Sequence, residues 1–183
     1  MGKFYLSPTE QKKLLTISRT TLIEYVTNKI KPKFEINEPN LLVKTGIFVT
    51  LNKKSSLRGC IGYIEGFEPL YQAVINNTIS ACCHDPRFPS VQEYELKDIH
   101  IEISVLTPPK LIQNWSEIKI GKHGIIFRNG MYQSVFLPQV ATEQNWDLET
   151  TLSHLSLKAG LSADAWLDKN SKFKIFEAQI FGE

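Results

Sequence analysis

The sequence predicts a protein of the α+β class, with a mixed or antiparallel sheet and helices packed on it. Its hydrophobic residues follow, in order, the period of a helix, a hairpin, a helix, a strand, a hairpin, a helix and a strand. This order lacks the repeating strand–helix units of a doubly wound parallel sheet. No internal repeat is visible, and 42% of the 183 residues are hydrophobic, which is enough for an ordinary core. We therefore expect one domain over residues 1–183.

The first part of the chain predicts a helix followed by a hairpin. Ser7-Pro8-Thr9-Glu10 is typical of a helix start, because the serine can cap and the glutamate can reach back to complete a capping box. An apolar stripe follows, and Pro32 is expected to end the helix. Residues 46–51 alternate between apolar and polar, residues 53–56 form a turn, and residues 57–64 return, which predicts a hairpin.

The middle of the chain predicts a second helix and a long strand. Pro69 opens the helix, which must end near Asp85 because the following proline restricts that residue. Residues 99–106 alternate strictly and place His100, Glu102 and Ser104 on one polar face. That face can form a site wall, or it can be the solvent-exposed side of an edge strand.

The last part of the chain predicts a second hairpin, a third helix and a final strand. Residues 124–127 and 131–137 flank Asn129-Gly130, a dipeptide favoured in two-residue turns. Asp147 can cap the third helix, whose apolar residues recur at spacings of three and four. The final strand is expected over residues 172–181.

Composition excludes several classes of protein. Lys and Arg number 21 against 19 Asp and Glu, and the formal charge of +2 is too small to indicate a nucleic-acid or membrane surface. No apolar run approaches the roughly 18 residues that span a bilayer. Three cysteines form an odd set without a secretory leader, which favours a reducing cytoplasm. We expect a cytoplasmic protein with no membrane partner. Nucleic-acid binding would require Lys and Arg to gather on one face, which the linear sequence does not show.

The segment Leu57-Arg58-Gly59-Cys60-Ile61-Gly62 carries the main candidate site. Side chains alternate along a strand, so Arg58 and Cys60 should share a face roughly 7 Å apart. A nearby guanidinium favours the thiolate and can lower the cysteine pKa below its usual value of about 8.5. Gly59 and Gly62 mark places where a backbone or a ligand comes close. Alternatively, Cys60 fills a packing position, and Arg58 pairs with a carboxylate such as Glu102 or Asp85.

Other polar residues are weaker candidates. A base for Cys60 can come from His84, His100 or His123, and only geometry can decide among them. Asp85 and Arg87, in the loop after the second helix, can line the site or simply hold the loop. Cys82-Cys83-His84 lacks the spacing of zinc ligands, so no metal site is predicted there or elsewhere.

Six ordered motifs together resemble the AMMECR family. They are Leu57-Arg58-Gly59-Cys60-Ile61-Gly62, Asp85-Pro86-Arg87-Phe88-Pro89, Ile101-Glu102-Ile103-Ser104-Val105-Leu106, Gly121-Lys122-His123-Gly124, Leu137-Pro138-Gln139-Val140-Ala141 and Lys158-Ala159-Gly160-Leu161. The resemblance implies a two-lobed α+β fold, an Arg-Gly-Cys segment in or near a cleft, and no agreed activity.

The resemblance also implies partners. Bacterial and archaeal members look like protein A of the AmmeMemoRadiSam system, which is associated with a Memo-like protein and a radical SAM protein. Ser156 stands where members commonly carry a cysteine, which weakens any two-cysteine mechanism, and the Cys82-Cys83-His84 run also departs from the usual pattern.

Two functional hypotheses follow. In the first, the protein is an accessory enzyme or substrate-handling component that acts with these partners on a small anionic or nucleotide-like ligand. Arg58 would then hold the anion, Cys60 would act as nucleophile or contact, and the ligand-binding residues would include Gly59, Gly62, Asp85, Arg87, Glu102 and His123. In the second, the protein is a noncatalytic interaction module and the Arg-Gly-Cys motif is structural. The sequence leaves the cofactor undetermined under both hypotheses.

Overall fold

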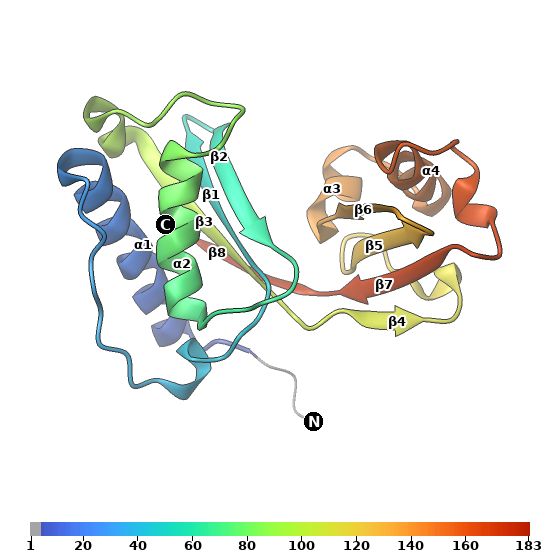
Figure 1. The fold of residues 1–183 in the computed structure, drawn as a ribbon, viewed down its shortest axis with the longest axis horizontal. Helices are drawn as coiled ribbons and strands as arrows, with labels where there is room; N and C mark the ends of the chain where they lie inside the picture. Colours follow the sequence, from blue (N-terminus) through green and yellow to red (C-terminus); the bar gives the residue numbers. More distant parts are fainter. Residues whose placement is uncertain (1–4) are drawn as a thin grey trace. The chain divides into compact units, whose positions relative to one another are not determined.

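The computed structural model describes residues 5–183, which divide into two compact units, drawn in Figure 1. The first unit holds residues 5–106 and 179–183, and the second holds residues 107–178. The elements of the first unit are α1 (Pro8–Asn28), β1 (Ile47–Lys53), β2 (Ser56–Tyr63), α2 (Leu70–Cys83), β3 (Ile99–Leu106) and β8 (Ala178–Gly182), with the 3₁₀ turns η1 (Pro39–Leu41) and η2 (Glu93–Asp98).

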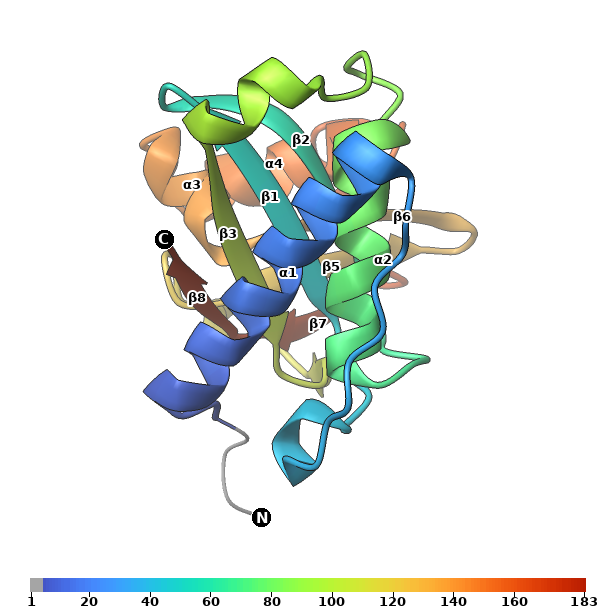
Figure 2. The ribbon, with the colours of Figure 1, turned by 90° about the vertical axis from the view of Figure 1, so that its left-hand side faces the viewer.

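The first unit is a four-stranded sheet with helices on one face. Its strand order is β2-β1-β3-β8, and β1 pairs antiparallel with both β2 and β3. Figure 2 shows α1 and α2 lying over the same face of these strands. The alternating residues Ile47, Val49 and Leu51 of β1 point into this interface and are fully buried. Where the two helices meet, the hydroxyls of Ser18 and Thr78 share a buried hydrogen bond of 2.7 Å.

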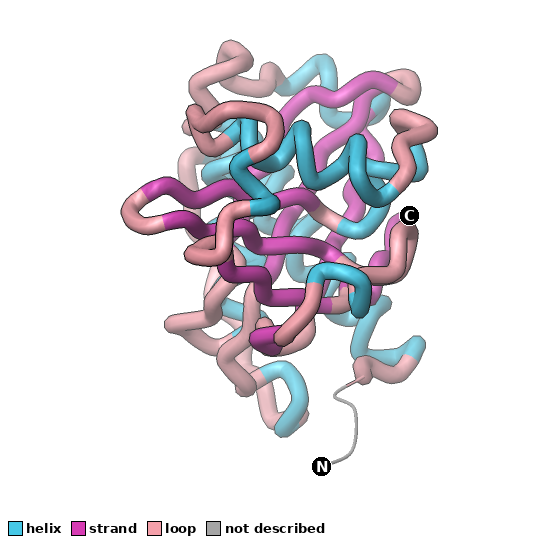
Figure 3. Tube along the Cα trace, turned by 90° about the vertical axis from the view of Figure 1, so that its right-hand side faces the viewer, coloured by secondary structure: helices cyan, strands magenta, loops and turns pink. Residues whose placement is uncertain are grey.

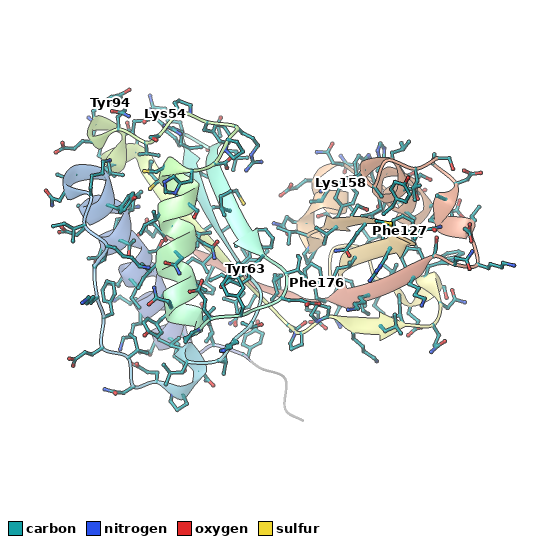
Figure 4. All side chains as sticks on the ribbon, in the orientation of Figure 1. Lys54, Tyr63, Tyr94, Phe127, Lys158 and Phe176 are labelled. Atoms are coloured by element: carbon teal, nitrogen blue, oxygen red, sulfur yellow. The ribbon has the colours of Figure 1, made fainter. Side chains whose placement is uncertain are left out.

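The second unit is also a four-stranded sheet, in the order β4-β7-β5-β6. Its elements are β4 (Lys110–Ile112), η3 (Trp115–Glu117), β5 (Gly124–Asn129), β6 (Tyr132–Phe136), α3 (Pro138–Glu143), α4 (Leu148–Lys158), η4 (Ala165–Leu167) and β7 (Lys172–Phe176). Its paired strands are antiparallel. Phe127 of β5, labelled in Figure 4, is fully buried and packs in one core with Leu152 and Leu155 of α4. Figure 3 shows the helices and strands of this unit along the chain trace.

The α+β class predicted from the sequence is confirmed, since both sheets are built from antiparallel pairs and carry helices. The capping box at the start of α1 is present, with Ser7 accepting from the Glu10 N–H and Glu10 accepting from the Ser7 N–H. The strand over residues 99–106 and the cap of α4 by Asp147 are also confirmed. The local signals for these elements do not depend on the rest of the fold.

The ends of several elements differ from the sequence predictions. Helix α1 ends at Asn28, before Pro32, because Lys29 adopts a left-handed conformation with φ 58°. The predicted final strand over residues 172–181 is two strands, β7 and β8, which belong to different sheets. The break falls at Glu177, whose backbone pairs with Thr107 instead of continuing a ladder.

Two further corrections concern strands. Strand β3 lies between β1 and β8, so the interpretation of its polar face as part of an edge strand is wrong. The second hairpin turns at Gly130 and Met131, one residue later than predicted, and Asn129 pairs with Tyr132. The short elements α3 and β4 were not predicted, because they are too brief to show a hydrophobic period.

Within residues 5–183, every helix is too short or too polar to cross a lipid bilayer.

The contact between β2 and α2 allows only glycine at position 59. A Cβ atom built on Gly59 would lie 2.1 Å from the carbonyl oxygen of Ala81 in α2. We expect Gly59→Ala to lower the free energy of unfolding by about 2–4 kcal/mol, because backbone must move to relieve the clash. Ser56→Ala, at an exposed position of the same strand, should change it by less than about 0.5 kcal/mol. Chemical denaturation of both variants tests this, and equal stabilities would contradict the packing described here.

Candidate functional site

Cys60 lies on β2, an edge strand of the first sheet, on the face turned away from α1 and α2. Its neighbour across the ladder is Thr50, and Thr50 in turn lies opposite Glu102 on β3. Val49 and Leu51 point into the helical interface, so Thr50 between them faces the other way. The Thr50 hydroxyl contacts the half-buried Cys60 sulfur at 3.2 Å. Cys60, Thr50 and Glu102 therefore form one row across the sheet.

Side chains of the loop after α2 hold the backbone of Cys60. The Cys60 N–H donates to Asp85 Oδ2 at 2.9 Å, and Arg87 Nη2 donates to the Cys60 carbonyl at 2.9 Å. Because β2 is an edge strand, these two groups have no ladder partner on that side, and the loop satisfies both. The sequence placed Asp85 and Arg87 among the site residues, and the structure brings both to Cys60.

Asp85 and Arg87 form a charge-assisted pair at this edge. Arg87 donates from Nε to Asp85 Oδ1 at 2.9 Å and from Nη2 to Oδ2 at 2.7 Å. The Asp85 side chain is only 1% exposed, whereas that of Arg87 is 53% exposed. Hydrogen bonds from Arg87 hold the pKa of the Asp85 carboxyl well below its usual range, and burial opposes them only in part. Asp85 is therefore an anchor, and Arg87 still presents a cationic face to solvent.

Arg58 is engaged elsewhere. It donates from Nε and Nη2 to the two carboxylate oxygens of Glu95 in η2, at 3.1 and 2.9 Å, and from Nη1 to the carbonyl of Pro89 at 2.9 Å. The prediction that Arg58 pairs with Glu102 or Asp85 is therefore wrong, because its carboxylate partner is Glu95. The ladder is also irregular at this point, because Leu51 pairs with Gly59 and Asn52 pairs with Leu57. Arg58 is the additional residue of this bulge, which interrupts simple alternation along β2.

Glu95 is the site residue that sequence reasoning missed. Its buried carboxylate also accepts from Lys53 Nζ at 2.8 Å and from the Gln92 N–H at 2.9 Å. Hydrogen bonds from Arg58 are the largest cause that lowers the pKa of Glu95 to about 2. The available signal was the spacing of Gln92 and Glu95, which form a capping box at the start of η2. That pattern predicts a turn but not a partner for Arg58.

The two glycines beside Cys60 are explained by the chain itself. Gly59 lies against the backbone of Ala81, and a Cβ atom on Gly62 would meet the Ile47 carbonyl and the Phe48 ring. The close approach expected at these positions is confirmed, but the approaching groups belong to the same unit. Contact of either glycine with a ligand stays a prediction.

The candidate histidines have separate surroundings. His84 ends α2 and packs edge-on against Tyr25, with ring centroids 6.5 Å apart. His100 is exposed and lies opposite Asn52 on β1. His123 belongs to the second unit, where its Nδ1 accepts from the Lys119 N–H at 3.1 Å, and burial lowers the pKa of its ring. None of these contacts identifies a base for Cys60.

No group of three or more His, Cys, Asp or Glu side chains within residues 5–183 is arranged to hold a metal ion. The sulfurs of Cys82 and Cys83 are 3.3 Å apart, and burial raises the pKa of the Cys82 thiol. What the site does offer is a half-buried thiol and a hydroxyl beside a partly exposed guanidinium. Such a group can bind a carboxylate or phosphate, and a thiol beside a cation can act as a nucleophile.

Comparison with known proteins gives a consistent result. The AMMECR1 family model matches residues 15–181. A protein of Thermococcus onnurineus is 45% identical over 182 residues, covering 93% of this chain and 88% of the relative. One of Methanothermobacter thermautotrophicus is 41% identical over 185 residues, covering 97% and 96%. The crystal structure of uncharacterized protein PH0010 from Pyrococcus horikoshii is similar with a TM-score of 0.87 and 38% identity, covering 94% of this chain and 91% of that chain.

The Arg58–Glu95 pair predicts a specific acid dependence of stability. The pKa of Glu95 is lowered from 4.5 to about 2, so its stabilisation is complete above about pH 4.5 and is lost as pH falls toward 2. This shift corresponds to roughly 3 kcal/mol. We expect Glu95→Gln to lower the free energy of unfolding by about that amount at pH 7, and by much less near pH 2. Denaturant titrations of both proteins at several pH values test this, and a difference independent of pH would contradict the assignment.

Proposed function

The chain belongs to the AMMECR1 family, and from this premise we propose that it is a cytoplasmic accessory enzyme or substrate-handling component that binds a small anionic or nucleotide-like ligand at the Cys60 edge of its first sheet. Arg87 supplies the cation that meets the anion, and the Cys60 thiol is the reactive or contacting group. Arg58, through its bonds to Glu95, positions the strand that carries Cys60. The partners of the protein are Memo-like and radical SAM proteins, as the resemblance to the AmmeMemoRadiSam system implies.

One observation carries this proposal. Asp85 fixes the Cys60 backbone and the Arg87 guanidinium together, while half of the Arg87 side chain stays exposed. A guanidinium whose orientation is already set loses less entropy when it binds an anion, and Arg87 Nη1, which donates to neither Asp85 nor Cys60, can donate to an oxygen of a carboxylate or phosphate. The same guanidinium lies at the Cys60 carbonyl, so a bound anion would sit beside the thiol.

A second candidate function is a noncatalytic interaction module. The observation that favours it is that both arginines of the motifs bond to carboxylates within their own unit. In that case the Arg-Gly-Cys segment only shapes the edge of the sheet, and the function resides on a protein-binding surface. The reactivity of the Cys60 thiol separates the two candidates.

We expect Cys60 to react with iodoacetamide at pH 6.5 at least tenfold faster than Cys82 in the folded protein. Cys60 is half-buried beside a guanidinium, whereas Cys82 is buried and burial raises the pKa of its thiol. Mass spectrometry of each cysteine-containing peptide over time measures both rates in one sample. A Cys60 rate as low as that of Cys82 would favour the interaction module.

We expect Cys60→Ala to abolish the stimulation of a reconstituted system that contains the Memo-like and radical SAM proteins of the same organism, with 5′-deoxyadenosine formation as the readout. The melting temperature should stay within a few degrees, because the substitution removes one half-buried sulfur. Cys83→Ala is the matched control, since it removes another half-buried thiol of the same unit and should keep full stimulation. Full stimulation by Cys60→Ala would rule out thiol chemistry.

A further inference from the structure

The first unit contains a concave surface apart from the Cys60 edge. A groove of about 990 Å³ lies between the second half of α1, the turn η2 and the start of β3. Its lining includes Arg19 and Ile23 of α1, Tyr94 and Leu96 of η2, and Glu183. Neither Cys60 nor Arg87 lines it. This volume is in the usual range for a small-molecule site.

Arg19 is held in one orientation at this groove. Its Nη1 donates to the carbonyl of Leu96 at 3.3 Å and its Nη2 donates to the carbonyl of Ile99 at 2.6 Å. These bonds attach the guanidinium to the backbone of the groove wall. The edge formed by Nε and Nη2 remains as a fork, which is the geometry that binds a carboxylate with two parallel hydrogen bonds.

The chain itself places a carboxylate in this fork. Arg19 Nε donates to Glu183 Oε1 at 3.1 Å, and Arg19 Nη2 donates to Glu183 Oε2. The Glu183 side chain is part-exposed, so the ion pair lies at the groove surface. Because the pair is partly exposed, water reaches it and a carboxylate from solution can compete with that of Glu183 for the guanidinium.

Apolar and polar side chains both line the rest of the groove. Ile23 is 42% exposed and Tyr94 is 73% exposed, so both present apolar surface to a ligand. The other polar residues of the lining are Thr27, Glu93, Lys97 and His100. Figure 4 labels Tyr94 on η2, away from the core of the unit. A ligand that covered these side chains would remove apolar area from water and would gain binding free energy.

We propose that this groove binds a carboxylic acid with an apolar body. The carboxylate of the ligand replaces that of Glu183 on Arg19, and its hydrocarbon lies along Ile23, Tyr94 and Leu96. The exchange is a reversible association in which one carboxylate leaves the guanidinium and another takes its place. The chain's own glutamate is thus an intramolecular competitor that sets the concentration at which the ligand binds.

The test uses hexanoate, octanoate and decanoate as probes with the full chain, measured by calorimetry and by amide NMR shifts. We expect the dissociation constant to fall by up to about fourfold for each added methylene, with shifts centred on Ile23, Leu96 and Ile99. Decanol, which has no carboxylate, should bind at least tenfold more weakly than decanoate. Equal binding of decanol and decanoate, or shifts centred elsewhere, would overturn the proposal.

Two variants sharpen this test without touching the core. Glu183→Gln removes the competing charge and should tighten decanoate binding at least fivefold. Ile23→Ser, at an exposed position of α1, should weaken it severalfold. If decanoate fails to bind both the wild type and Glu183→Gln up to about 10 mM, a concentration at which even millimolar affinity is visible, the groove does not have this role. Cys60 alkylation stays unchanged in both variants, so this test is independent of the proposed function.

Discussion

The buried carboxylate of Asp85 is the constraint on which the candidate site depends. A carboxylate removed from water must be surrounded by donors, because an unpaired buried charge costs several kcal/mol. Asp85 meets this requirement with the Cys60 N–H and three donors of Arg87. As a result, one side chain satisfies the open edge of β2, fixes the backbone that carries the thiol, and orients the guanidinium that bonds to the Cys60 carbonyl.

The two arginines of the candidate site have the same side chain but different roles. Arg58 donates from all three guanidinium nitrogens to groups of its own unit, and with Glu95 it joins the hairpin to η2. Arg87 bonds to Asp85 through Nε and Nη2, and half of its side chain remains exposed to water. The difference lies in burial, since the Arg58 side chain is 12% exposed. Burial favours a structural role for Arg58 and leaves Arg87 able to meet a ligand.

Much of the fold could be predicted from the sequence, because its signals are local. The Ser7 capping box, the alternation from Ile99 to Leu106 and the Asp147 cap each depend on neighbouring residues, and each is confirmed. The candidate site was predicted in part. Cys60, Asp85 and Arg87 do come together, but the pairing of Arg58 with Glu95 spans 37 positions. No periodic pattern reports a contact between residues so far apart.

The sequence by itself determined the class of the fold, the family and the residue types of the site, because hydrophobic period, capping residues and ordered motifs are properties of the linear chain. Only the tertiary structure decided which carboxylate each arginine meets and which sheet each half of the final strand joins. Those choices depend on which buried charges find donors and which edges find partners once distant segments are packed together. The pairings are decided by the free energy of the packed fold. Before the chain packs, its sequence is compatible with other pairings of the same residues.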